Sequence, residues 1–175
     1  MATPIGHFLT GAAIGTALSR GNDVFRTAAI GALAAVAADF DFLPGLMLGH
    51  LSRFHHQQSH SIMFALFAAL LAMLFAKEGR LRWAMLVGLA YASHLALDLL
   101  TFDDSPPHGI PIFWPWSTAV FQSPLTLFPN VPWGGGFVLS AHNVNLLIRE
   151  LAFLGPLFLG AFLYVRRRHR VLQEG

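Results

Sequence analysis

The amino-acid sequence predicts an all-α membrane protein, a polytopic bundle of about five hydrophobic helices in a single domain over residues 1–175. Hydrophobic side chains make up 55% of the chain and charged ones only 11%, whereas soluble domains carry about 25% charged residues. The apolar residues form five runs that are separated by charges, Gly or Pro. So little polar surface cannot cover the protein in water, and several runs approach the ~20 residues that cross a bilayer.

The five apolar runs define the predicted helices, which lie at 5–19, 24–48, 61–76, 82–101 and 146–165. The first and third are short. A fifteen-residue helix covers about 22 Å, so residues 5–19 either span a thinned bilayer or form half of a re-entrant hairpin. Residues 102–145 are rich in Pro, Trp and Gly. This composition, with Trp114, Trp116 and Trp133, is typical of an interfacial segment at the membrane surface.

The basic residues predict the orientation in the cell (inner) membrane. Five spans place the loops near 19–26 and 76–82 on the same side as the C-terminus, and all of the 11 Lys and Arg residues except Arg53 and Arg149 fall there. By the positive-inside rule, the C-terminus is cytoplasmic and the N-terminus lies outside. The basic clusters are short and lie between apolar runs, so they indicate topology and contact with membrane lipids, not nucleic-acid binding.

Ionisable groups gather at the opposite, extracytoplasmic end. Every histidine except His169 lies at or near that end, together with Asp39, Asp41 and Asp98. Such groups at membrane depth usually mark a functional site or a paired network. The chain has no cysteine, so a metal ion there would need His and carboxylate ligands.

Two histidine patterns have the spacing of metal ligands. His94 and Asp98 are four residues apart and project from one face of a helix, although an intrahelical hydrogen bond would also satisfy both. His56 and His60 have the same spacing, whereas His55 and His60 would require the chain to bend before its helix begins. The sequence leaves both pairs open, and a hydrated polar loop would equally explain these histidines.

Asp39 and Asp41 end the second apolar run without a neighbouring Lys or Arg. Carboxylates near membrane depth need a compensating cation, which a metal would supply. His7 begins the first helix, where a lone histidine is also typical of the membrane interface. Because these groups come from four helices at similar depth, we predict the following metal ligands: His7, Asp39, Asp41, His55, His60, His94 and Asp98. Nitrogen and oxygen ligands suit one or two divalent ions, most simply zinc, with manganese or iron as alternatives.

Six short motifs occur in order along the chain: Gly6-His7-Phe8-Leu9, Asp39-Phe40-Asp41, His55 to Ser61, Ser93-His94-Leu95-Ala96-Leu97-Asp98, Gly109-Ile110-Pro111 and Trp114-Pro115. In this ordered set the chain resembles the YdjM-like family of membrane-bound metal-dependent hydrolases. The resemblance implies that the seven ligands above form the metal site. It departs at His56, where the family usually has Arg, at Ser59, where it has Thr, and at Ala38, where a Pro is common. The loss of the Arg matters most, since a guanidinium could hold a substrate anion.

The resemblance also implies hydrolysis, and its His/Asp-rich helical site looks similar to that of zinc-dependent phospholipases C and related nucleases. We therefore expect cleavage of a phosphoester in a lipid or lipid-linked substrate that enters from the outer leaflet. Asp41 or Asp98 would act as the general base, and His56 would act as the acid near the leaving group. The alternative is a non-catalytic metal protein, either a metal-stabilised scaffold or a divalent-metal carrier. A carrier would need polar groups along a path to the cytoplasm, and Ile62 to Phe75 offers none.

Overall fold

The computed structural model describes residues 2–49, 56–104, 108–130 and 140–174, with the backbone alone at 169–174. The described segments contain helices and loops but no strand, and two isolated β-bridges join Thr101 to Phe128 and Ile110 to Phe121. The helical elements are α1 (Pro4–Ala17), α2 (Val24–Val36), the 3₁₀ helix η1 (Ala37–Asp41), α3 (Phe42–Met47), α4 (Ile62–Phe75), α5 (Arg80–Leu99) and α6 (Ala141–Glu174).

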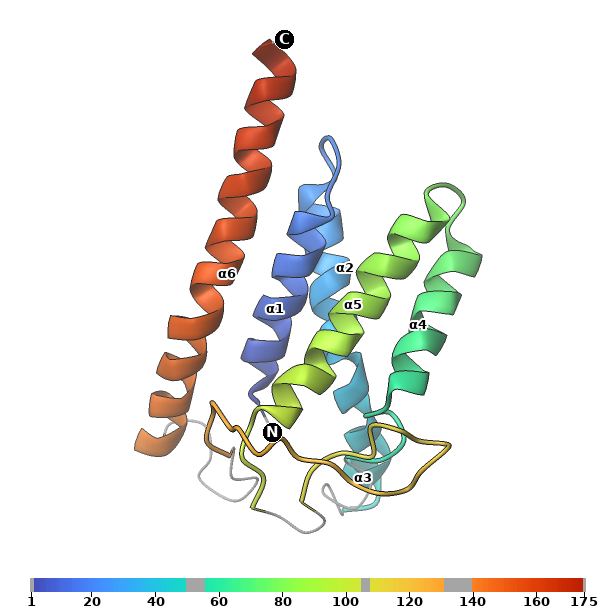
Figure 1. The fold of residues 1–175 in the computed structure, drawn as a ribbon, viewed down its shortest axis with the longest axis vertical. Helices are drawn as coiled ribbons and strands as arrows, with labels where there is room; N and C mark the ends of the chain where they lie inside the picture. The colour runs from blue at the N-terminus through green and yellow to red at the C-terminus, as the bar shows by residue number, and fades with distance from the viewer. Residues whose placement is uncertain (1, 50–55, 105–107, 131–139, 175) are drawn as a thin grey trace.

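The long helices run side by side, and the connection between α5 and α6 lies across one end of the bundle (Figure 1). Helix α1 packs against α2, α5 and α6, while α5 also packs against α2 and α4. These two helices therefore form the centre of the fold. The start of α1 and the end of α5 meet at the same end of the bundle as the α5–α6 connection (Figure 1).

Glycines allow α1 and α2 to pack with their backbones in contact. A Cβ atom on Gly15 would lie 2.0 Å from the Thr27 carbonyl oxygen, and one on Gly31 would lie 2.2 Å from the Gly11 carbonyl oxygen. Small residues permit this close approach between helices in membranes. The contact fixes the register of α1 against α2, and so the position of His7 near the start of α1.

The run predicted as one helix at 24–48 is divided into α2, η1 and α3. Pro44 gives a physical reason, because a proline within a helix removes one hydrogen bond and its ring clashes with the carbonyl four residues earlier. That carbonyl belongs to Phe40, inside the 3₁₀ segment. The tighter turn places Asp39 on the inner side, where only 9% of the residue is exposed.

The other predicted helices differ from the structure mainly at their ends. Helix α6 begins at Ala141 and ends at Glu174, so it is longer than the predicted 146–165, because polar residues continue the helix beyond the apolar run. Its first residues fall within the predicted interfacial segment 102–145. In that segment, Ile110 and Phe128 are buried against the helices, while Trp133 lies outside the described residues.

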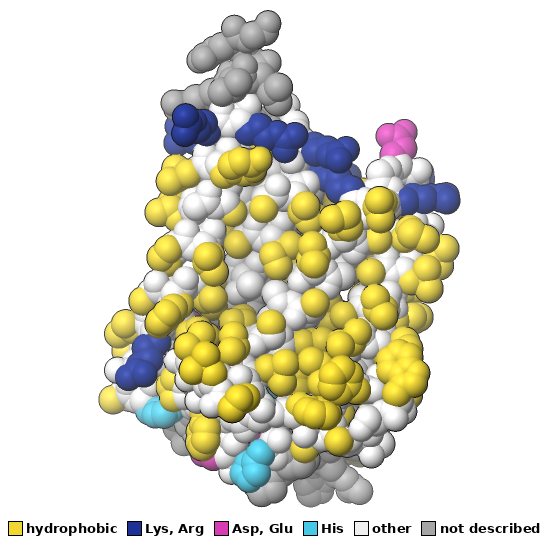
Figure 2. Space-filling model, viewed as in Figure 1, with side chains coloured by type: hydrophobic (Ala, Val, Ile, Leu, Met, Phe, Trp, Pro, Cys, Tyr) yellow, Lys and Arg dark blue, Asp and Glu magenta, His cyan; other side chains and the backbone are white. Residues whose placement is uncertain are grey.

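Two described stretches are long and apolar enough to cross a bilayer: Val24–Met47 and Ala141–Arg168. Helix α4 is apolar but has 14 residues, as does α1, and such a helix is about 21 Å long. The bundle is therefore helical with two candidate spans, and five full spans are not supported by length and composition. On the face seen in Figure 2, apolar side chains cover much of the bundle, and most of the visible Lys and Arg side chains lie at the end near the C-terminus.

Candidate metal centre

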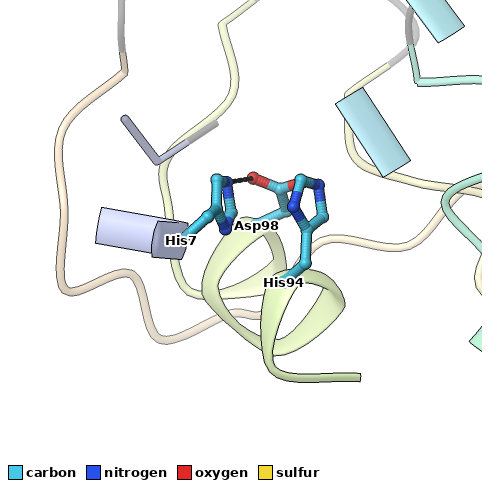
Figure 3. Close-up of side chains that lie close together, drawn as sticks. All are labelled: His7, His94 and Asp98. Carbon is cyan, nitrogen blue, oxygen red and sulfur yellow. Dashed lines mark ion pairs between the residues drawn. The ribbon is translucent and has the colours of Figure 1, made fainter. Parts of the chain in front are cut away.

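Three buried side chains meet where the start of α1 packs against the end of α5. His7 lies on α1, and His94 and Asp98 lie on α5 (Figure 3). The rings of His7 and His94 stack with their centroids 3.7 Å apart, and His7 Nε2 lies 3.4 Å from Asp98 Oδ1. His94 Nε2 also lies 3.0 Å from Asp98 Oδ2. The contact within α5 is thus one part of a cluster between helices.

His60 and Asp39 complete the cluster from two other elements. His60 precedes α4, and its Nε2 atom lies 3.1 Å from His94 Nε2 and 3.6 Å from Asp98 Oδ2. Asp39 lies in η1, and its Oδ1 atom is 3.5 Å from His94 Nε2 and 3.7 Å from His60 Nε2. Asp39, His60 and His94 thus form one group with metal-binding geometry, and Asp98 joins His94 and His7 in a second group. We refer to Asp39, His60, His94 and Asp98 as the central set.

The outer ring nitrogens of the two central histidines face acceptors. His94 Nδ1 lies 2.7 Å from the Ala35 carbonyl oxygen, which can only accept a hydrogen bond, so Nδ1 carries the proton. His60 Nδ1 lies 3.2 Å from Asp41 Oδ2, which likewise favours a proton on Nδ1. If both rings are neutral, each Nε2 atom is then unprotonated and presents a lone pair to the other ring. Metal-binding histidines commonly have this outer hydrogen bond to a carbonyl or carboxylate.

The central set fits a divalent metal ion. Two Nε2 lone pairs 3.1 Å apart repel each other unless a cation lies between them. Four ligands in a tetrahedron around zinc, with bonds of about 2.0–2.1 Å, lie about 3.3 Å from one another. Five of the six distances within the central set run from 3.0 to 3.7 Å. Each group of described residues with metal-binding geometry contains either Asp39 or Asp98 beside the histidines, and not both. The buried His and Asp residues could therefore bind a metal ion.

A proton is the alternative to a metal at this contact. Burial lowers the pKa of the His60 imidazole, but hydrogen bonding to Asp39 and Asp41 outweighs burial and raises that pKa to about 9. A protonated His60 would donate from Nε2 to His94 Nε2. Metal analysis of the purified protein distinguishes the two states, since the metal-bound site contains an ion and the site with a protonated His60 does not.

Asp41 lies on the outer side of His60. Its Oδ2 atom accepts a hydrogen bond from Ser59 Oγ at 2.7 Å and lies 3.2 Å from His60 Nδ1. The Tyr91 hydroxyl donates to the Ser59 carbonyl oxygen at 2.8 Å, which ties this turn to α5. The three groups of described residues with metal-binding geometry do not include Asp41. Its contacts are those of a residue that orients His60.

His56 lies beside the central set, whereas His55 lies outside the described residues. The His56 ring packs edge-on against His60 with their centroids 4.9 Å apart, and His56, His60 and Asp98 form another group with metal-binding geometry. His56 Nδ1 lies 3.7 Å from Asp103 Oδ2. The His56 backbone has a φ of 60°, an uncommon conformation for a non-glycine residue. The three groups overlap, because His60, His94 and Asp98 each belong to two of them.

The sequence matches the YdjM inner membrane protein family over residues 1–170. The chain belongs to this family. No curated protein and no solved structure matches it. The YdjM match includes all residues of the central set and, with the apolar helices, indicates a membrane protein.

Two buried acids in this YdjM protein were not predicted from the sequence. Asp103 faces His56 and accepts a hydrogen bond from the Gly109 amide at 3.0 Å. Glu150 on α6 accepts one from the Thr3 amide at 2.7 Å and another from the Thr3 hydroxyl, so it holds the start of the helix that carries His7. A lone acid within an apolar run is a signal for Glu150. Asp103 lies in an irregular segment and carries no such pattern.

Proposed function

We propose that the protein is a membrane-bound, metal-dependent hydrolase that cleaves a phosphoester in a lipid or lipid-linked substrate. The proposal rests on one observation: His60 Nε2 and His94 Nε2 face each other at 3.1 Å while the outer nitrogen of each ring faces an acceptor. Asp39 and Asp98 supply the oxygen ligands. Zinc is the first choice for this set, with manganese or iron as alternatives.

The membrane arrangement is also part of the proposal. All five long helices would be inserted, with the shorter α1 and α4 crossing a locally thinned bilayer. The Lys and Arg residues at the end of the bundle near the C-terminus would lie in the cytoplasm. In this orientation the central set of the single membrane domain would face the extracytoplasmic side.

An apolar groove supports a lipid substrate. A cavity of about 420 Å³ runs along α1 and the α2–α3 region, and its lining is apolar except for Asp39 of the central set. Phe8 and Phe40 are about half exposed along it. An acyl chain or another apolar tail could lie here while its phosphate group reaches Asp39. A water-soluble substrate would gain nothing from such a lining.

The bound metal would lower the pKa of a water molecule and polarise a phosphoryl oxygen. Asp98 is our choice for the general base, because its two oxygens could divide the roles: Oδ2, 3.0 Å from His94 Nε2, would hold the metal, and Oδ1, which lies 3.4 Å from His7 Nε2 and accepts from the Ala2 amide at 3.2 Å, would act as the base. His56 would donate the proton to the leaving group, with Asp103 stabilising its charged form. Asp41 would orient His60.

A metal-stabilised scaffold is the second candidate, and one observation favours it. His7, His60 and His94 are each 0% exposed. Structural metal sites are closed, whereas catalytic sites keep a position open to water or substrate. The two candidates agree on the metal and differ on turnover, so the same experiment separates them.

The test combines metal analysis with activity. We expect detergent-purified wild type to contain about one equivalent of metal and His94→Ala to contain almost none, with His142→Ala as the control because His142 lies outside the central set. We also expect wild type to hydrolyse short-chain phospholipids, with loss of activity on chelation and recovery on adding zinc. Metal without hydrolysis would support the scaffold. A wild type that neither contains metal nor takes it up would contradict both candidates.

A further inference from the structure

The opposite end of the bundle contains a second cavity. It has a volume of about 500 Å³ and lies between the end of α1, the start of α5 and the last described side chains of α6. Four of its lining residues are arginines, and none of the lining residues is acidic: the arginines are Arg20, Arg80, Arg82 and Arg168. We refer to this feature as the arginine cavity. Its charge favours an anion.

Two buried polar groups line the arginine cavity without a hydrogen-bond partner among the described residues. Ser19 is 2% exposed, and its hydroxyl oxygen makes no hydrogen bond. Arg82 donates from Nε to the Leu18 carbonyl oxygen at 2.8 Å and pairs through Nη1 with Asp23 at 2.7 Å, while its buried Nη2 makes no hydrogen bond. Buried donors normally have partners. A hydrogen-bond acceptor bound in the cavity would give the Ser19 hydroxyl and Arg82 Nη2 the partner that they lack.

The start of α5 adds a third favourable feature. The helix begins at Arg80 after Gly79, which has a φ of 60° and offers no side-chain cap. The first turn of a helix carries backbone N–H groups without intrahelical partners and has a partial positive charge. Phosphate groups bind at such positions. Here the helix start coincides with the arginines and with the buried Ser19 hydroxyl.

We propose that the arginine cavity binds a phosphate group, carried by the headgroup of an anionic phospholipid. Planar guanidinium groups suit phosphate oxygens. Apolar side chains adjoin the arginines, since Leu81 is 70% and Met85 46% exposed in the lining. Trp83 lies alongside, with the Arg26 guanidinium 5.1 Å from its ring centre, as at a membrane interface. Basic pockets between membrane helices bind lipid headgroups in this way. The proposal goes beyond hydrolysis and does not depend on it.

The test is lipid retention by the full-length protein in a neutral detergent, followed by native mass spectrometry. Wild type should retain one phosphatidylglycerol or cardiolipin molecule in preference to phosphatidylcholine. The double variant Arg80→Gln/Arg168→Gln should bind it about 30-fold more weakly, at about 5-fold per arginine. Ser19→Ala should reduce binding about 3-fold. Arg149→Gln is the control, because Arg149 is an exposed arginine that pairs with Asn145 outside the cavity.

Every variant should melt within a few degrees of wild type, so that weaker binding is not unfolding. Equal loss of lipid in Arg149→Gln would overturn the proposal, since binding would then follow net charge alone. Equal retention of phosphatidylcholine would also overturn it. If millimolar inorganic phosphate displaces the lipid and binds as well alone, the ligand is a free phosphate and the lipid assignment is wrong.

Discussion

The two ends of the bundle differ in whether their ionisable side chains are buried and paired or exposed. At the end that carries the central set, His and Asp atoms are buried and lie 3.1–3.7 Å from partners on other elements. At the other end, arginines line an open cavity, and one of them, Arg82, forms an ion pair with Asp23. Buried charges are costly unless they are matched, whereas the exposed Arg20, Arg80 and Arg168 keep their hydration. Changes at the first end should therefore affect metal binding and folding, and changes at the second should affect ligands and topology.

The largest expected difference between the two ends is their side of the membrane. The chain has no cysteine, so single cysteines report topology without a background. Lys77→Cys lies in the α4–α5 turn and Thr118→Cys in the α5–α6 connection, and both positions are exposed. In intact cells, a membrane-impermeant maleimide should label Thr118→Cys and not Lys77→Cys.

Permeabilised cells provide the control, because both variants should then be labelled. Labelling of both positions in intact cells would mean that the ends lie on one side, and the inserted five-helix arrangement would be wrong. Labelling of Lys77→Cys alone would reverse the proposed orientation.

The next largest effect is expected where α1 packs against α2. Gly15→Ala would place a Cβ atom 2.0 Å from the Thr27 carbonyl oxygen, and backbone atoms cannot rotate away. We expect a loss of about 3 kcal/mol in unfolding free energy, measured by denaturant titration in mixed micelles. Metal content and lipid retention should fall together, because α1 contributes to both ends.

Gly155→Ala is the matched control for this change. A Cβ atom on Gly155 has no neighbour within 4 Å, and alanine favours helix by about 0.5–1 kcal/mol. The control should leave both ends unchanged. Equal destabilisation by the two substitutions would show that the α1–α2 contact is not the tight one.

Helix positions could be predicted from the sequence, because the apolar runs correspond to helices and the polar residues between them correspond to the connections. The spacing of His94 and Asp98 placed both residues on one face, and the structure confirms that they share it. The 3₁₀ segment Ala37–Asp41, which divides the predicted helix 24–48, was harder to predict, because it depends on how the residues around Pro44 pack against the other helices. The aligned match over residues 1–170 confirms the family resemblance.

The pairing of the remaining site residues could not be predicted, because it depends on loops whose paths are set by tertiary contacts. The sequence offered both His55 and His56 as companions of His60. The structure brings His56 to 4.9 Å from His60, and the metal-ligand roles of all these residues stay predictions. Asp103 approaches His56 only because the α5–α6 connection folds back over the end of the bundle.

A smaller effect is expected at Asp41, which the sequence predicts to be a metal ligand or the general base. Its contacts with Ser59 Oγ and His60 Nδ1 instead favour an orienting role. Loss of such an outer partner typically lowers metal affinity 10- to 100-fold. We expect Asp41→Asn to lower zinc affinity by about this amount in competition with a fluorescent chelator, without changing lipid retention in the arginine cavity.

Asp104→Asn is the control, because Asp104 is an exposed acid at the same end. An equal effect of both substitutions would mean that general negative charge, not orientation of His60, governs affinity. Complete loss of metal in Asp41→Asn, with the fold intact, would make Asp41 a direct ligand.

The smallest effect is expected at Asp23, which pairs with Arg82 at 2.7 Å. Partial burial opposes ionisation of this carboxyl, but hydrogen bonding to Arg82 and to the Arg20 amide outweighs burial and lowers its pKa. A depressed pKa means that its stabilising contribution is present above the unfolded-state pKa, about 3.9, and is lost as the pH falls through the lower folded-state value. At pH 7, Asp23→Asn should cost less than about 1 kcal/mol.

Asp23→Asn also releases Arg82 Nη1 toward the arginine cavity. We expect anionic lipid to bind about 2- to 3-fold more tightly, because one competing carboxylate near the guanidinium is removed. Glu78→Gln, which changes an exposed acid in the α4–α5 turn, should have no such effect. Weaker lipid binding in Asp23→Asn would mean that the carboxylate holds Arg82 in its binding position, so that the ion pair orients the cavity instead of competing with its ligand.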